Sequence, residues 1–314
     1  MKHALIFYII LAGGFFLFSN NITYRITFEQ PAVPEKIIIL PPEKLEAVQI
    51  PPPPPSEPIT QPAPPKPATT ILLPPPPNPI AQSELYAKGL LATVNFLCPN
   101  KDGTYAVATG ALIDSHGYIV SNAHIVEESN QQIICTIRAG SPAIEIGKVK
   151  LVLMSAEYFA TTDEQTKARM DISLWKLEGV RTDWPYWEID FDTTPKVGEQ
   201  LFTQSYPAEL LSSEIVFKNL NLLFSNTVVS ETDTSFIASR ATIAAQHGSS
   251  GGILIDPYTG KLRGIIFGIS SDANKAINER VLYAITPSRI NALAWQETKK
   301  QFREYLSALP EPAY

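Results

Sequence analysis

The sequence has little cysteine and little histidine, with two cysteines and four histidines among its 314 residues. Cys98 and Cys135 form no CxxC motif, and the histidines are too scattered to complete a metal-binding cluster with them. We therefore expect no metal site and no cofactor. The two cysteines alone leave open whether they are buried free thiols or a disulfide.

An excess of positive charge is also lacking. Acidic and basic residues are mixed along the chain, and the formal net charge is −6 at pH 7. A protein that binds nucleic acid through its phosphates needs a basic stripe or patch. We therefore do not expect nucleic acid as a partner.

One long apolar run stands at the N-terminus. Lys2 and His3 precede it, and it covers the fifteen residues from Ala4 to Phe18. As a helix this run would span about 22 Å, somewhat less than the roughly 30 Å hydrocarbon core of a membrane. A cleaved secretion signal is the alternative, but no small-x-small cleavage site follows the run. We interpret residues 1–24 as an uncleaved signal anchor, which predicts a single-pass membrane protein. Its folded domain would lie on the extracytoplasmic side, periplasmic or extracellular, because Lys2 stays inside.

Proline is concentrated in one segment, which holds 19 of the 28 prolines between Pro31 and Pro79. Proline has no N–H to donate, so this segment cannot form a helix or a sheet. Runs of proline favour polyproline II, which is stiff and extended. We interpret residues 25–80 as a linker that holds the following domain away from the membrane. A ligand for a proline-binding protein is the alternative.

Residues 81–309 show short strands separated by turns, followed by a tail at 310–314. A first group of strands is expected at 90–98, 105–113, 118–121, 132–138, 146–154 and 171–177. A second group is expected at 200–206, 215–223, 226–230, 236–239, 252–255, 262–269 and 280–285. A polar surface loop is expected at 157–169, and a helix that covers a barrel at 288–306. Two sets of about six strands without strand–helix alternation predict an all-β domain of two antiparallel barrels.

A serine among glycines is the first sign of chemistry. In the segment His-Gly-Ser-Ser-Gly-Gly at 247–252, Ser250 can sit on a sharp turn with its hydroxyl exposed. Gly248 can adopt a positive φ without steric cost, which lets the N–H groups of Gly248 and Ser250 converge on one spot. Two such amides can stabilise the negative oxygen of a tetrahedral intermediate. An ordinary glycine-serine turn is the alternative for this segment alone.

A serine needs a base to become a nucleophile, and histidine is suited to this near neutral pH. His116 lies in a tight turn, and His247 is expected to shape the loop or its rim. His124 follows a buried-looking strand and is the best candidate. Asp171 opens an apolar strand, where a carboxylate is costly unless it is paired. Orienting His124 and stabilising its cation would satisfy that carboxylate.

The segments at 110–124, 171–175 and 247–256 resemble those of trypsin-like, chymotrypsin-fold serine proteases, and most of all the bacterial HtrA type. The order is His124, Asp171, Ser250, with separations of 47 and 79 residues. Similar stretches at 260–268 and 284–287 extend the resemblance to about 85–308. It implies two six-stranded barrels and a serine endopeptidase that cleaves a protein or peptide substrate through an acyl-enzyme.

The sequence also departs from that family. Ser249 stands where many trypsins have an aspartate that pairs with a newly released N-terminus, so activation of that kind is not expected. The stretch at 241–247 is longer than its HtrA counterpart, so we expect the oxyanion loop to need rearrangement. We expect no PDZ domain after the barrel-covering helix, and HtrA-type oligomerisation is not carried over.

The resemblance assigns further residues. Ala244 and Ala245 would lie near the base of the specificity pocket, and Phe267, Gly268 and Ile269 would form one wall. Without an acidic residue there, we expect a small or medium apolar substrate side chain.

A disulfide between Cys98 and Cys135 is hypothesised, because the first and fourth strands are neighbours in such a barrel. Two rival functions remain. The chain could be an inactive trypsin-like fold that binds a peptide or an envelope protein, or a structural tether acting through its proline-rich segment.

Overall fold

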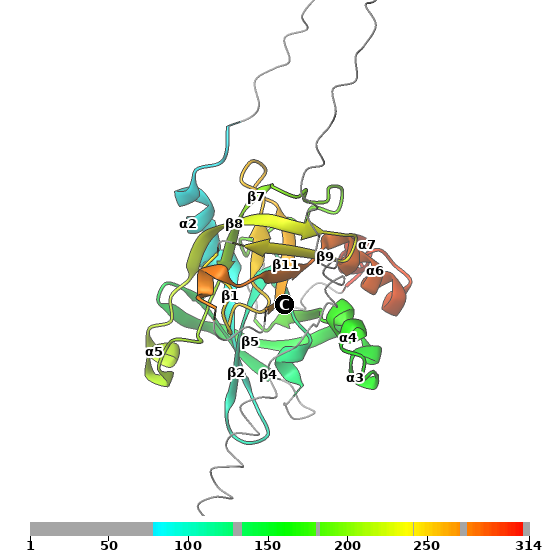
Figure 1. Cartoon of the computed structure of the whole chain (residues 1–314). Coiled ribbons are helices and arrows are strands. Elements are labelled where there is room, and N and C mark those ends of the chain that lie inside the picture. The colour runs from blue at the N-terminus through cyan, green and yellow to red at the C-terminus, as the bar shows by residue number, and fades with distance from the viewer. Residues whose placement is uncertain (1–77, 128–133, 180–182, 241, 271–274, 310–314) are drawn as a thin grey trace, which may run out of the picture. The chain divides into compact units, whose positions relative to one another are not determined.

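The structure is a computed structural model that describes residues 78–127, 134–179, 183–240, 242–270 and 275–309 (Figure 1). The expected membrane segment, nearly all of the proline-rich linker and the tail at 310–314 lie outside these residues. Within the described ranges, no helix has the length and apolar character needed to cross a membrane.

The first half of the domain is a closed antiparallel barrel in the order β1-β2-β3-β6-β5-β4. Its strands are β1 (Thr93–Pro99), β2 (Tyr105–Leu112), β3 (Tyr118–Ser121), β4 (Ile134–Gly140), β5 (Ala143–Met154) and β6 (Ser173–Leu177). Alternate residues of β1 point inward, so Val94 and Phe96 lie in the barrel core beside Leu112, Ile119 and Trp175. Residues of β1 between them are buried too, because other elements cover its outer face.

The second half is another closed barrel, in the order β10-β11-β12-β9-β8-β7. Its strands are β7 (Gln200–Ser205), β8 (Leu223–Thr232), β9 (Phe236–Arg240), β10 (Ile253–Ile255), β11 (Leu262–Ile269) and β12 (Leu282–Ile285). All of its strand pairs are antiparallel. The structure therefore confirms the prediction of two six-stranded antiparallel barrels.

Two stretches expected to be strand or loop are helical. Residues 215–223 were expected to form a strand, but α5 (Ser213–Lys218) occupies the first part of that range. Ser212 caps it by accepting the N–H of Ile215. Of the apolar residues that suggested a strand, Val216 is buried while Ile215 and Phe217 are exposed on this short helix. The expected loop at 157–169 contains α3 (Ala156–Ala160) and α4 (Glu164–Met170). Asp163 caps α4 by accepting the N–H of Thr166 at 2.8 Å.

The ends of the domain also differ from expectation. The first strand was expected from residue 90 but begins at Thr93. The residues before it form α2 (Gln82–Ala92). The single helix expected at 288–306 is two helices, α6 (Pro287–Thr298) and α7 (Phe302–Ser307), which lie side by side (Figure 1). The break follows from Lys299, which takes a left-handed φ of 61° and ends α6.

The C-terminal helices cover the seam between the barrels. Ile290, Leu293 and Phe302 belong to one buried cluster with Leu174 of the first barrel and Phe267 of the second. The helix expected to cover a barrel therefore packs against both barrels and adds to the apolar contact between them.

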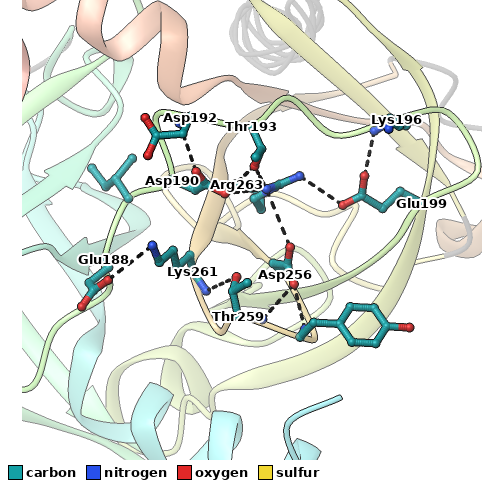
Figure 2. A network of polar contacts seen from close by, with 12 residues as sticks. Glu188, Asp190, Asp192, Thr193, Lys196, Glu199, Asp256, Thr259, Lys261 and Arg263 are labelled. Atoms are coloured by element: carbon teal, nitrogen blue, oxygen red, sulfur yellow. Dashed lines mark hydrogen bonds and ion pairs between the residues drawn. The ribbon is translucent and has the colours of Figure 1, made fainter. Parts of the chain in front are cut away.

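A buried ion-pair network fixes the segment that joins the barrels (Figure 2). Arg263 of β11 donates from Nη1 to Asp190 at 2.5 Å and to Thr193, and its Nη2 lies 3.3 Å from Glu199. Asp256 also faces the guanidinium, at 3.7 Å. Burial alone would raise the pKa of Asp190, but hydrogen bonds from Thr193 and the backbone of 192–193, with the charge of Arg263, outweigh it and lower that pKa. The network therefore attaches the segment between β6 and β7 to β11 of the second barrel.

A disulfide joins the two cysteines across neighbouring strands of the first barrel. Leu97 of β1 lies opposite Thr136 of β4, which sets Cys98 opposite Cys135. Their sulfurs are bonded, and their Cα atoms are 4.3 Å apart. The bond lies between the strands on which the sequence hypothesis placed it.

Candidate active site

His124 and Asp171 are in direct contact. His124 begins the 3₁₀ turn η1 (His124–Val126) just after β3, and Asp171 stands between α4 and β6. The Asp171 carboxylate accepts the backbone N–H of His124 through Oδ1 at 2.8 Å, and its Oδ2 lies 2.6 Å from Nδ1 of the imidazole. Because an ionised carboxylate can only accept, Nδ1 carries a proton, and in the neutral form of the ring the lone pair is then on Nε2.

The surroundings of Asp171 hold its carboxylate in place. Asp171 is only 3% exposed, and its carbonyl oxygen accepts from Nδ2 of Asn122 at 2.8 Å. The hydroxyl of Ser173 donates to the Asn122 carbonyl oxygen at 2.6 Å. Hydrogen bonds therefore join the end of β3 to the start of β6 beside the contact of Asp171 with His124.

The electrostatics favour a histidine that binds a proton. Burial by itself would lower the pKa of the His124 imidazole. The charge and hydrogen bond of Asp171, together with the charge of Glu127, outweigh burial, and the pKa of His124 is raised above its ordinary 6.5. An imidazole of this kind is a stronger base than a free one.

Ser250 lies on the loop before β10, against the first barrel. Thr109 of β2 forms two hydrogen bonds to this loop. Its N–H donates to the Ser250 carbonyl at 2.7 Å, and its hydroxyl donates to the Gly248 carbonyl at 2.8 Å. The same hydroxyl accepts the N–H of Tyr206 at 2.9 Å, and the Thr109 carbonyl accepts from the hydroxyl of Ser121 at 2.6 Å. Ser121 is three residues before His124. One strand residue therefore links the serine loop to the segment that presents the histidine.

The Ser250 hydroxyl forms no hydrogen bond with the His124 imidazole in the structure. Within the described part of the chain, its hydroxyl makes no hydrogen bond. The structure thus joins His124 to Asp171 and sets the Ser250 loop on neighbouring strands, without a serine–histidine hydrogen bond. Such bonds are often long in ligand-free enzymes and tighten when substrate binds.

Two backbone amides beside Ser250 are available as donors. Neither the Gly248 nor the Ser250 N–H donates to any described residue. Gly248 has a φ of 93°, the positive value that the sequence analysis anticipated for it. The His247 carbonyl accepts from the N–H of Ala208 at 2.8 Å. A trans peptide points its C=O and N–H in opposite directions, so the Gly248 N–H is turned away from Ala208.

The residues assigned to substrate specificity lie in two environments. Ala244 and Ala245 are fully buried in the core of the second barrel, in the cluster that contains Ile266. Phe267 is buried too and packs against other aromatic rings. The neighbouring Gly268 and Ile269 are half-buried, and a Cβ at Gly268 would meet no atom within 4 Å. There is therefore open space beside Gly268. A specificity pocket lined by all five residues stays a prediction.

Several contacts of the site had no signal in the sequence. Thr109 immediately precedes the segment at 110–124 but looks like an ordinary strand threonine. Ser249 is buried, and its hydroxyl lies 3.0 Å from that of Ser205, a partner 44 residues away. Among the described residues, no three His, Cys, Asp or Glu side chains gather to hold a metal ion.

Comparison with known proteins identifies the family. A family model described as a trypsin-like peptidase domain matches residues 108–265, just over half of the chain. The matched solved structures include the crystal structure of the serine endoprotease from Yersinia pestis, at 22% identity and a TM-score of 0.48 over 73% of this chain and 69% of that one. No curated protein sequence matches. From the matching family model, the chain belongs to the trypsin-like peptidase domain family.

Proposed function

We propose that the protein is a serine endopeptidase with His124, Asp171 and Ser250 as its catalytic triad. The observation that carries this is that Asp171 binds both the backbone and the ring of His124, in a site where the N–H groups of Gly248 and Ser250 donate to no described residue. An aspartate held this way orients the imidazole, and two unpaired amides are suited to receive a developing oxyanion.

The first half of the proposed reaction forms an acyl-enzyme. Nε2 of His124 takes the proton of the Ser250 hydroxyl as Oγ attacks the carbonyl carbon of the peptide. The carbonyl oxygen becomes an oxyanion and accepts from the N–H groups of Gly248 and Ser250. Asp171 stabilises the imidazolium that forms. His124 then gives the proton to the leaving amine as the C–N bond breaks.

The second half releases the product. Water attacks the acyl carbon while His124 takes its proton, and Ser250 leaves as the proton returns to Oγ. The balance of the two halves is hydrolysis of one peptide bond. No metal or cofactor enters any step.

Labelling with a fluorophosphonate probe tests the assignment. The wild type is expected to be labelled, and Ser250→Ala is expected to lose labelling while its urea unfolding stays unchanged. Ser249→Ala is the matched control, because that hydroxyl is buried against Ser205 and should not react. Equal labelling of the Ser250→Ala variant would show that another residue is the nucleophile.

The rival function is a peptide-binding module without catalysis, and it is supported by the Ser250 hydroxyl, which makes no hydrogen bond to any described residue. This reading predicts a wild type that binds peptides but is neither labelled nor able to cleave them. The same probe experiment therefore separates the two functions. A tether acting through residues 31–79 would lose its role when that segment is deleted, whereas a peptidase would still cleave peptides.

The proposed location rests on the sequence of residues 1–24 and 25–80. A positively charged start, an apolar run and a proline-rich spacer support a membrane anchor with the peptidase on the extracytoplasmic side. Membrane fractionation of the full chain tests the anchor. Protease added to cells with an opened outer layer and an intact cytoplasmic membrane tests on which side the domain lies. Recovery in the soluble fraction, or protection of the domain from added protease, would contradict the proposal.

A further inference from the structure

Glu209 lies between β7 and α5, beside the loop that carries Gly248. Its Oε2 accepts the backbone N–H of His247 at 3.1 Å, and the preceding residue, Ala208, donates its own N–H to the His247 carbonyl at 2.8 Å. Two consecutive residues therefore hold both backbone polar groups of His247. The Ala208 bond fixes the peptide between His247 and Gly248, and the Glu209 bond fixes the peptide that precedes it, so neither peptide can turn without losing a hydrogen bond.

The orientation of the peptide between His247 and Gly248 decides what faces the substrate. With the His247 carbonyl on Ala208, the Gly248 N–H points the other way and has no partner among the described residues. A rotation of this peptide by half a turn would exchange the two groups and present a carbonyl oxygen in place of the N–H. An oxygen there would repel the oxyanion that the amide is suited to bind.

Arg280 holds Glu209 in place. Its Nη1 lies 2.9 Å from each oxygen of the Glu209 carboxylate and 3.4 Å from the carbonyl oxygen of Ala245, on the same loop. Arg280 is only 8% exposed, and its Nε is buried with no hydrogen-bond partner among the described residues. A guanidinium buried in this way needs a carboxylate, so Glu209 is the group that keeps it there.

The charge state of Glu209 agrees with this role. Burial by itself would raise the pKa of its carboxyl. Hydrogen bonds from Arg280 and from the His247 backbone, with the charge of Arg280, outweigh burial and lower that pKa. Glu209 is therefore ionised wherever His124 is neutral.

We propose that Glu209, held by Arg280, is a positioning residue that keeps the oxyanion-binding loop in its active arrangement. The inference rests on the proposed function and deepens it. In many trypsins, an aspartate before the nucleophile and a released N-terminus form an ion pair under this loop. Here that position is Ser249, whose side-chain hydroxyl, among the described residues, hydrogen-bonds only to the hydroxyl of Ser205. The Glu209–Arg280 pair supplies an ion pair that needs no released terminus.

Kinetics of Glu209 variants test the proposal. Glu209→Ala is expected to lower kcat for a peptide substrate and the affinity for a peptide boronic acid by about 10- to 100-fold. Outright loss of one oxyanion donor costs roughly 10²- to 10³-fold in kcat, which sets the upper limit. KM and the affinity for the product peptide should change less than about twofold, because they do not involve an oxyanion. Glu209→Gln should lose less, since its amide oxygen can still accept from His247.

Glu214→Gln is the matched control. Glu214 is an exposed acid of α5 whose one ion pair within the described ranges is with Lys218, 3.0 Å away at the surface, and its change should leave both quantities unaltered. Urea unfolding of every variant identifies those that are folded, and Glu209→Gln serves if Glu209→Ala does not fold. Unchanged kcat in a folded Glu209 variant, or a loss of kcat with full boronic acid affinity, overturns the inference. A wild type that is neither labelled by a fluorophosphonate nor active on peptides overturns the proposed function, and the inference with it.

Discussion

Replacing Gly251 with alanine tests whether the serine loop is fixed by its contact with the first barrel. Gly251 follows Ser250 and has a φ of 81°, which an alanine rarely adopts. A Cβ there would lie 1.8 Å from the carbonyl oxygen of Thr109 and 2.3 Å from the hydroxyl oxygen of Ser121. Since these atoms belong to backbone and to a buried side chain, the loop must move away from β2 and β3.

The expected loss of stability has two sources. A non-glycine residue in the left-handed region costs about 1–2 kcal/mol. Moving the loop away also breaks the bond from the Thr109 N–H to the Ser250 carbonyl and disturbs the bond from the Ser121 hydroxyl to Thr109. Each buried group left unpaired costs about 1–3 kcal/mol. We expect Gly251→Ala to lower the free energy of unfolding by about 3–6 kcal/mol, a large share of the roughly 5–15 kcal/mol of a typical domain.

Gly103→Ala isolates the contribution of the contact. Gly103 has a similar φ of 85°, but a Cβ there would meet no atom within 4 Å. It should lose only the cost of the backbone conformation, about 1–2 kcal/mol, and keep normal fluorophosphonate labelling of Ser250. Urea unfolding and the labelling rate measure both variants. Equal losses in the two variants, with normal labelling of Gly251→Ala, would refute the reasoning.

Three further predictions concern the pH dependence and the stability of the fold. Glu127→Gln removes a negative charge that raises the pKa of His124, so the kcat/KM profile should move to lower pH, and a shift to higher pH would contradict this. Replacing Cys98 and Cys135 with alanine opens a loop between residues 37 apart, which should lower the free energy of unfolding by about 4 kcal/mol in a non-reducing urea titration; an unchanged midpoint would contradict it. Arg263→Met strips the buried carboxylates of their cation and should cost about 3–5 kcal/mol, again by urea unfolding, while a gain in stability would show that the network is dispensable.

The barrels could be predicted because their strands carry a local signal. Short runs of β-branched residues between turns mark strands wherever each strand is held by its neighbours, as at 118–121 and 262–269. The same rule failed at 215–223, where Ile215, Val216 and Phe217 stand on a helix of a single turn or two. Periodicity cannot distinguish a short apolar strand from a short helix. The serine cap at Ser212 and the pair of Glu214 and Lys218 at i,i+4 are the local signs that favour the helix.

The site could be predicted only in part for a similar reason. His124 and Asp171 stand next to strand ends with recognisable neighbours, and their burial cost makes a pairing expected. Glu209 and Arg280 are 71 residues apart, and nothing near either one in the sequence points to the other. The same holds for Thr109 and Gly248, separated by 139 residues. Contacts of this length come from how the two barrels pack, which a pattern along the chain does not contain.

The geometry of the serine loop and the packing of the two barrels depend on the same residue. Thr109 belongs to the first barrel, yet it contacts Gly248 and Ser250 on the loop and Tyr206 at the end of β7, all in the second half of the chain. Its hydroxyl uses one donor and one acceptor in doing so, which leaves it no freedom to rotate. Any shift of one barrel against the other must therefore move the carbonyls of Gly248 and Ser250, and with them the amides of the same loop. The seam between the barrels therefore sets the position of the proposed oxyanion donors, and the bonds of Ala208 and Glu209 to His247 orient the peptides just before them.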